Sequence, residues 1–244
     1  MERENTQEHV LIVGGSSGMG LALAERLLAR GSEITIVGRS EKKLSQAKQH
    51  LRGDTKLHTL STDITCEDEV ESLFRETGPL HHIVSTAADI TGVYVPLSEM
   101  DTRTARKVMD SKVIGPLLLA KHGAPSLSHG GSITFTSGIA AYRPAAKGTV
   151  VAAVNGALES LAYALAIELA PIRVNVVSPG WVDTPIWDAV AGDGKDAALD
   201  SMAKRLPVAR IGQPADIAHA IDALMHNGFV TGTVFHVDGG QRLI

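Results

Sequence analysis

The stretch HVLIVGGSSGMG, residues 9–20, decides the fold. It opens with an apolar, β-favouring run (residues 9–14) that is typical of a buried strand, and a helical pattern follows over residues 21–30. The glycines between them allow a sharp turn and a close approach of backbone to a pyrophosphate, while free N–H groups at the helix start face its negative charge. This strand–turn–helix order predicts a nucleotide site, and an ordinary strand–helix turn is the alternative.

Short apolar runs and helix-period runs continue to alternate along the rest of the chain. Further strands are expected at residues 33–37, 56–60, 82–85, 132–136, 173–177 and 233–237, and further helices at 41–51, 67–76, 102–122, 150–169 and 215–225. Because parallel strands are connected by helices, this alternation predicts an α/β, Rossmann-type, doubly wound parallel sheet with helices on both faces. A single domain, residues 1–244, is expected.

Two segments stand apart from this pattern. Residues 1–8 are polar and are expected to be disordered. Within residues 185–206, Gly192, Asp193 and Gly194 interrupt a helical pattern, so this segment is expected to be either a substrate lid or a surface loop.

Composition narrows the classes of partner. A net charge of −4 gives no indication of nucleic acid or an anionic membrane as a partner. The longest apolar stretch, residues 150–169, is interrupted by Asn155, Glu159 and Glu168, so no membrane span is expected. Cys66 is the only cysteine, and the first residues lack the apolar centre of a signal peptide. We therefore expect a soluble cytoplasmic protein.

The glycine spacing, Gly14-x3-Gly18-x-Gly20, resembles that of the short-chain dehydrogenase/reductase family. The ending VTGTVFHVDGG, residues 230–240, resembles the family's C-terminal strand and turn. The resemblance covers nearly the whole chain, and it implies the same fold, a nicotinamide dinucleotide cofactor, a small-molecule substrate and a homodimer or homotetramer.

The resemblance also implies which residues contact the cofactor. Asp63-Ile64 corresponds to the family's adenine-contacting pair, and Pro179-Gly180 with Thr184 corresponds to its nicotinamide-side loop. The contacts implied in this way are Gly14, Ser16, Ser17, Gly18, Met19, Gly20, Asp63, Ile64, Ala87, Pro179, Gly180, Val182 and Thr184.

The end of the second strand favours NADP(H) over NAD(H). Enzymes that use NAD place a carboxylate there, but this chain has Gly38 at that position. Arg39 follows it and can make a planar, charge-assisted contact to a 2′-phosphate, to which Ser40 can add a hydroxyl. A solvated arginine at a strand end is the alternative.

The catalytic positions depart from the family pattern. The family uses a Tyr, a Lys four residues later, a Ser before them and an Asn on the preceding long helix. By register with neighbouring motifs, Val151 stands at the Tyr position and Asn155 at the Lys position. Valine cannot transfer a proton, so the usual Tyr-based mechanism is absent.

Four residues are candidates for a replacement site. Ser137 keeps the family's Ser position, although a serine capping local backbone is the alternative. Lys112 replaces the Asn, and we expect a partly buried amine of lowered pKa that can donate a proton and pair with Asn155; a lysine extending to solvent is the alternative. Tyr142 is a replacement acid or a substrate-stacking ring, or else a surface aromatic.

No metal site is expected. His219 and His226 lie seven residues apart and His81-His82 are adjacent, but neither pair has a carboxylate or cysteine at metal-ligand spacing. These histidines are interpreted as solvated or core residues.

Three functions remain open from the sequence. The first is an NADP(H)-dependent oxidoreductase with a rebuilt site, acting on a carbonyl, imine or other activated acceptor. The second is a catalytically silent NADP(H)-binding sensor, or a partner subunit of an active relative. The third is non-redox catalysis in the same pocket. Trp181 and Trp187 suggest an apolar or aromatic ligand.

Overall fold

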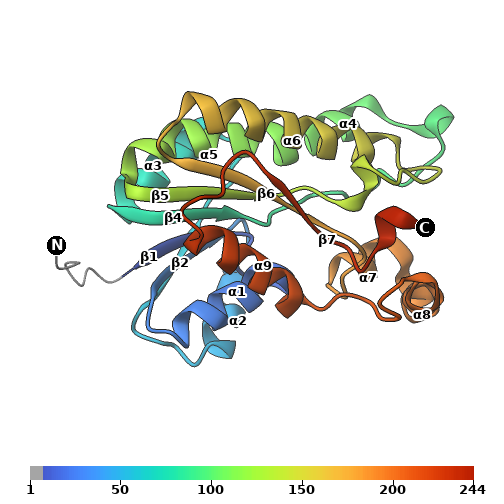
Figure 1. Cartoon of the computed structure of the whole chain (residues 1–244), viewed down its shortest axis with the longest axis horizontal. Coiled ribbons are helices and arrows are strands. Elements are labelled where there is room, and N and C mark those ends of the chain that lie inside the picture. The colour runs from blue at the N-terminus through green and yellow to red at the C-terminus, as the bar shows by residue number, and fades with distance from the viewer. Residues whose placement is uncertain (1–7) are drawn as a thin grey trace.

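The computed structural model describes residues 8–244 and contains a seven-stranded parallel sheet between two layers of helices (Figure 1). The strand order is β3-β2-β1-β4-β5-β6-β7. Successive strands are therefore added toward one side of β1 up to β3 and toward the other side from β4 onward, so the switch point lies between β1 and β4. The strands are β1 (His9–Val13), β2 (Glu33–Gly38), β3 (Leu57–Ser61), β4 (Leu80–Ser85), β5 (Leu127–Thr136), β6 (Arg173–Pro179) and β7 (Val234–Val237). This is the predicted doubly wound Rossmann-type sheet, in one domain.

Helices cover both faces of the sheet. One face carries α1 (Gly18–Leu28), α2 (Glu41–His50) and α9 (Pro214–His226), and the other carries α3 (Glu67–Thr77), α4 (Thr102–Met109), α5 (Gly115–Gly123) and α6 (Thr149–Glu168) (Figure 1). Each layer buries its own apolar cluster against the sheet, with Leu23 and Ile221 on the first face and Leu119 and Leu158 on the second. The ligand region of such a sheet lies at the carboxyl ends of the strands, where the order reverses.

Helix α6 is long and apolar enough to cross a membrane by length and composition. In the fold it packs on the sheet, burying Val154, Leu158, Ala162 and Leu165. Its outer face is exposed in the single chain, with Ile167 82% exposed. The single chain therefore covers only one side of this helix.

Two expected segments differ from the structure. The expected helix over residues 102–122 is divided into α4 and α5 by a π-helical turn, Asp110–Ile114. The segment 185–206 is not a loop, because α7 (Ile186–Ala191) and α8 (Lys195–Arg205) flank a turn at Gly192–Gly194. The expected disorder of residues 1–8 concerns residues outside the described part, except Glu8, which is placed and forms hydrogen bonds.

Candidate active site

The glycine turn after β1 is as tight as the sequence predicts. Gly14 has a φ of +83°, and a Cβ there would lie 2.7 Å from Thr86 Oγ1. A Cβ on Gly20 would lie 2.5 Å from the Gly14 carbonyl oxygen, so only glycine lets the start of α1 approach β1 this closely. Within the described chain no side chain caps the first N–H groups of α1, since Ser17 at the N-cap makes no such bond. These donors fit the pyrophosphate of a dinucleotide.

The expected ribose-phosphate side lies at the end of β2. A Cβ on Gly38 would lie 3.6 Å from Ser16 Oγ, so Ser16 borders the position from which a carboxylate is absent. Arg39 Nη2 donates to Asp89 Oδ2 at 2.9 Å, and both side chains are accessible to solvent. Burial opposes ionisation of Asp89, but the Arg39 hydrogen bond holds the pKa of Asp89 below its usual value. Ser40 Oγ accepts the Lys43 N–H at 3.3 Å and so caps α2.

The two residues expected at the adenine, Asp63 and Ile64, already make local contacts with their side chains. Asp63 Oδ1 accepts hydrogen bonds from the backbone and hydroxyl of Thr65, at 3.0 and 2.8 Å. The Ile64 side chain is buried in the core, where a Cβ on Gly115 would lie only 2.7 Å from its Cδ1. The Asp63 N–H also donates to Glu69 Oε2 at 2.7 Å, and its carbonyl accepts the Cys66 N–H at 3.0 Å, so local bonds occupy much of this residue.

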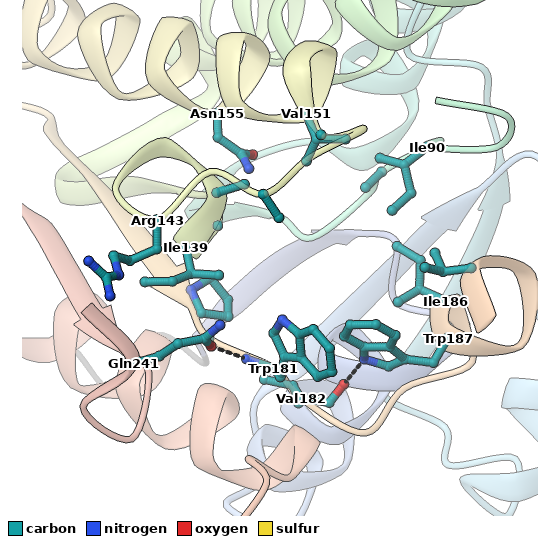
Figure 2. A pocket seen from close by; sticks show the side chains of 18 of the residues that line it. Ile90, Ile139, Arg143, Val151, Asn155, Trp181, Val182, Ile186, Trp187 and Gln241 are labelled. Carbon is teal, nitrogen blue, oxygen red and sulfur yellow. Dashed lines mark hydrogen bonds between the residues drawn. The ribbon is translucent and has the colours of Figure 1, made fainter. Parts of the chain in front are cut away.

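A cavity of about 670 Å³ opens beside the glycine turn (Figure 2). Met19 and the loop after β6 form one wall, and Trp181 and Trp187 lie on it with ring centroids 4.3 Å apart. Helices α7 and α8 contribute apolar side chains, including Ile186 and Met202, so the expected lid segment borders the cavity. The site residues predicted from sequence that line this cavity are Met19, Lys112, Ser137, Asn155, Pro179, Gly180, Val182 and Thr184.

Lys112 is buried against this cavity. Its side chain is on the π-helical turn between α4 and α5, the residue is 5% exposed, and Nζ donates to the Thr136 carbonyl oxygen at 2.6 Å. Burial lowers the pKa of Lys112 to about 8, although the negative charge of Glu159 acts in the opposite direction. The lysine therefore does not extend to solvent, and it borders the cavity.

Val151 and Asn155 lie one turn apart on α6 and both face the cavity (Figure 2). Asn155 is buried, and its Oδ1 has no hydrogen-bond partner among the described residues. An unpaired amide oxygen costs free energy when it is buried, so a donor from a ligand or water would stabilise it. Val151 brings only methyl groups to the adjacent turn.

Glu159 is the main residue that the sequence analysis missed. It is 5% exposed and lies one turn beyond Asn155 on the same face of α6. Its carboxylate accepts hydrogen bonds from the hydroxyls of Ser137, at 2.7 Å, and Tyr142, at 2.6 Å. A second polar residue four positions after Asn155, in a helix that is mostly apolar, was the available signal, but it was interpreted only as an interruption of a membrane span.

Two candidate roles change because of Glu159. Tyr142 does not line the cavity: its hydroxyl points to Glu159, and its ring packs edge-on against His236 with centroids 4.5 Å apart. Burial, followed by the bond to Glu159, raises the pKa of Tyr142 far above its usual value, so Tyr142 as a replacement acid was wrong. Ser137 does line the cavity, but its proton is donated to Glu159, which leaves its oxygen as an acceptor. Tyr94 is instead the tyrosine that borders the cavity.

Comparisons with known proteins agree with this fold. A family model described as Enoyl-(Acyl carrier protein) reductase matches residues 13–242. The short-chain dehydrogenase/reductase ATR9 of Stachybotrys chlorohalonatus is 35% identical, with 97% of each chain covered. The solved structure of the MalC Reductase/Diels-Alderase from Malbranchea aurantiaca has a TM-score of 0.90 and 31% identity, covering 98% of this chain and 97% of that one. A small-chain dehydrogenase solved in complex with NADPH has a TM-score of 0.83 and 34% identity, covering 98% and 100%.

A parallel sheet with a glycine turn and a cavity at its carboxyl edge defines a dinucleotide-binding oxidoreductase of the Rossmann type. The chain belongs to the short-chain dehydrogenase/reductase family, whose members bind nicotinamide cofactors and transfer hydride to or from small molecules.

Proposed function

We propose that this protein is an NADP(H)-dependent reductase that acts on an activated carbonyl, imine or similar small-molecule acceptor and uses Lys112 as its proton donor. The observation that carries this proposal is the buried Lys112 amine beside a cavity that Val151 also lines. The register of the sequence motifs assigns Val151 to the usual position of the catalytic tyrosine, which leaves Lys112 as the candidate donor. An ammonium of lowered pKa is a suitable general acid near neutral pH.

NADP(H) is favoured over NAD(H) by the side chains at the end of β2. Gly38 stands where enzymes that use NAD have a carboxylate. Arg39 is held by an exposed ion pair with Asp89, and a 2′-phosphate can take the place of that carboxylate. A 34% identical relative was solved with NADPH, which supports the same choice for this chain.

In the proposed reaction the protein's own side chains position the acceptor, donate the proton and exclude water from the cavity. The bound cofactor supplies hydride to the electrophilic carbon of the acceptor. Lys112 holds the proton that the acceptor's oxygen or nitrogen takes up, and solvent then reprotonates the amine. Glu159 favours the ammonium form of Lys112, and Ser137 can accept a hydrogen bond through its oxygen. The Trp181 and Trp187 rings exclude water and favour a flat, apolar substrate.

A silent NADP(H)-binding sensor or partner subunit remains the alternative, and Val151 is the observation that favours it. For either function we propose a cytoplasmic homodimer or homotetramer, with neither nucleic acid nor a membrane as partner. We further propose that α7 and α8 act as a lid, with the turn at Gly192–Gly194 as its hinge.

The test is NADPH oxidation by the purified protein across ketones, quinones, cyclic imines and conjugated enones. Turnover on one of them is expected, with Lys112→Met lowering kcat by about 10²-fold or more. Tyr142→Phe should retain activity, because its hydroxyl does not reach the cavity. Tight NADPH binding without turnover on any acceptor would favour the silent protein, and full activity in Lys112→Met would exclude Lys112 as the donor.

A further inference from the structure

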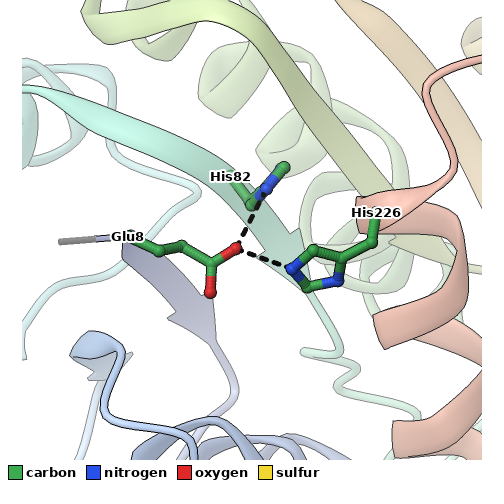
Figure 3. A group of neighbouring side chains, drawn as sticks. All are labelled: Glu8, His82 and His226. Carbon is green, nitrogen blue, oxygen red and sulfur yellow. Dashed lines mark hydrogen bonds and ion pairs between the residues drawn. The ribbon is translucent and has the colours of Figure 1, made fainter. Parts of the chain in front are cut away.

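Glu8, His82 and His226 lie side by side near the start of β1 (Figure 3). Glu8 immediately precedes β1, His82 lies on β4, and His226 is the last residue of α9. None of them lines the cavity, so this cluster is separate from the candidate active site. Sequence spacing indicated no carboxylate ligand for these histidines, but the fold brings Glu8 to His82 and His226.

The potential ligand atoms converge on one point. Glu8 Oε1 lies 2.9 Å from His226 Nε2 and 3.3 Å from His82 Nε2, and the three atoms all lie within 4.8 Å of one another. Zinc binds imidazole nitrogen and carboxylate oxygen at about 2.0–2.2 Å in a tetrahedron, which requires ligand atoms roughly 3.3 Å apart. The present spacing therefore needs only small side-chain movements to admit the ion.

A second hydrogen-bond partner also orients each of the three potential ligand residues. His82 Nδ1 lies 2.8 Å from Ser132 Oγ, and His226 Nδ1 lies 2.9 Å from Asp222 Oδ1. Ser32 Oγ donates to Glu8 Oε2 at 2.7 Å, which leaves Oε1 directed at the histidines. Both Nε2 atoms now donate to Glu8 Oε1, so a zinc ion bound here would displace those protons, while each Nδ1 keeps its second partner, as in metal-bound histidines.

A second cluster of similar residues lacks this arrangement. Glu67, Glu71 and His122 also lie close together, but the Lys121 ammonium bonds to Glu67 and competes with any cation. In the first cluster the partners of the Glu8 carboxylate are the Ser32 hydroxyl and the two imidazoles, and an imidazole that gives up its Nε2 proton becomes a ligand itself, which the Lys121 side chain bonded to Glu67 does not.

We propose that Glu8 Oε1, His82 Nε2 and His226 Nε2 bind one zinc ion. Imidazole nitrogens favour zinc, whereas calcium and magnesium require oxygen donors. His226 is about half exposed, so water can supply the fourth ligand. The ion fastens the start of β1 to β4 and to the end of α9, segments that lie far apart in sequence, and so its role is structural.

The experiment uses the full chain without a histidine tag, stripped of metal and then titrated with Zn²⁺ against a chromophoric chelator. One zinc per chain is expected, with metal content checked by mass spectrometry after dialysis. His226→Gln and Glu8→Gln should each weaken binding by more than tenfold, and Ser132→Ala by about 10- to 100-fold through the lost orientation of His82. His219→Gln is the matched control, because His219 is exposed on the same helix and should not change binding.

Folding of each variant is checked by circular dichroism, and Co²⁺ replaces Zn²⁺ to show tetrahedral geometry by its visible spectrum. Equal zinc affinity in the native chain, His226→Gln and Glu8→Gln would overturn the proposal. So would binding that His219→Gln weakens as much as His226→Gln does, because the ion would then be held elsewhere on α9.

Discussion

Lys112 and Glu159 are two opposite charges buried within the same small region. The carboxylate holds Ser137 and Tyr142 through their hydroxyl groups, and the amine is anchored to the Thr136 carbonyl oxygen. Burying one charge alone costs several kcal/mol, so each charge makes the other tolerable. The pair lets a lysine remain protonated near neutral pH beside an apolar cavity.

The protonation of Lys112 should appear in the pH dependence of reduction. A general acid must carry its proton, so kcat should be level below about pH 8 and fall as the pH rises through the pKa of Lys112. Because the charge of Glu159 raises that pKa, Glu159→Gln should move the decline to lower pH. The measurement is kcat against pH at saturating NADPH. The decline should be absent from the residual rate of Lys112→Met, and its persistence there would assign it to another group.

Arg39 should determine the choice between the two nicotinamide cofactors. Removing its charge-assisted contact should cost about 1.5–3 kcal/mol, so Arg39→Ala should weaken NADPH binding roughly 10- to 100-fold and leave NADH binding nearly unchanged. Asp89→Asn should strengthen NADPH binding, because Arg39 would no longer have to break an ion pair with Asp89 in order to contact the 2′-phosphate. Dissociation constants for both cofactors test this, with the exposed Lys42→Ala as control. Equal losses for NADPH and NADH in Arg39→Ala would contradict the assignment.

At the residue scale, the sequence predicted which residues share a site better than it predicted which hydrogen bonds they form. Motif spacing alone was enough to place Lys112, Ser137 and Asn155 at one site. It could not show that the Ser137 proton is donated to Glu159, or that Tyr142 turns away, because those bonds depend on how the loop after β5 folds back onto α6.

At the element scale, the π-helical turn between α4 and α5 presents Lys112. Gly115 donates its N–H to Asp110, one residue further back than in an α-helix. Pro116 has no N–H to give the Lys112 carbonyl, which favours this local widening. Periodicity predicted one continuous helix here, since a single wide turn barely changes the apolar pattern. In residues 185–206 the glycines suggested a loop, but apolar side chains packed on the cavity stabilise two short helices there.

The outer face of α6 leads to a prediction about assembly. Tyr163 and Ile167 are 47% and 82% exposed in the single chain, and covering them in a symmetric interface would remove apolar surface from water. Ile167→Glu should therefore dissociate the oligomer at micromolar concentration, as measured by light scattering after gel filtration. The substitution lies about three turns from Asn155, so cofactor binding should persist.

Leu97→Glu is the control for this prediction, because it adds the same charge at another exposed apolar residue. An oligomer unchanged by Ile167→Glu would place the interface on a different face. A monomeric native chain would show that this face of α6 has no partner copy.

At the scale of the whole molecule, the alternation of strands and helices was enough to predict the sheet and its two layers of helices. Short-range patterns could not predict contacts between distant segments. Glu8 and His226 are 218 residues apart and meet only because β1 and the end of α9 reach the same edge of the fold. The two sites thus lie at opposite ends of one rigid sheet.

The paired tryptophans of the cavity wall give this protein an optical property. The chain has only two tryptophans, and both border the cavity. Their rings are in contact, and the Trp187 indole N–H donates to the Val182 carbonyl oxygen at 2.8 Å. All tryptophan emission therefore originates beside the site, and reduced nicotinamide absorbs light in the range where tryptophan emits. Tryptophan fluorescence is thus a label-free record of cofactor and ligand arrival at the cavity.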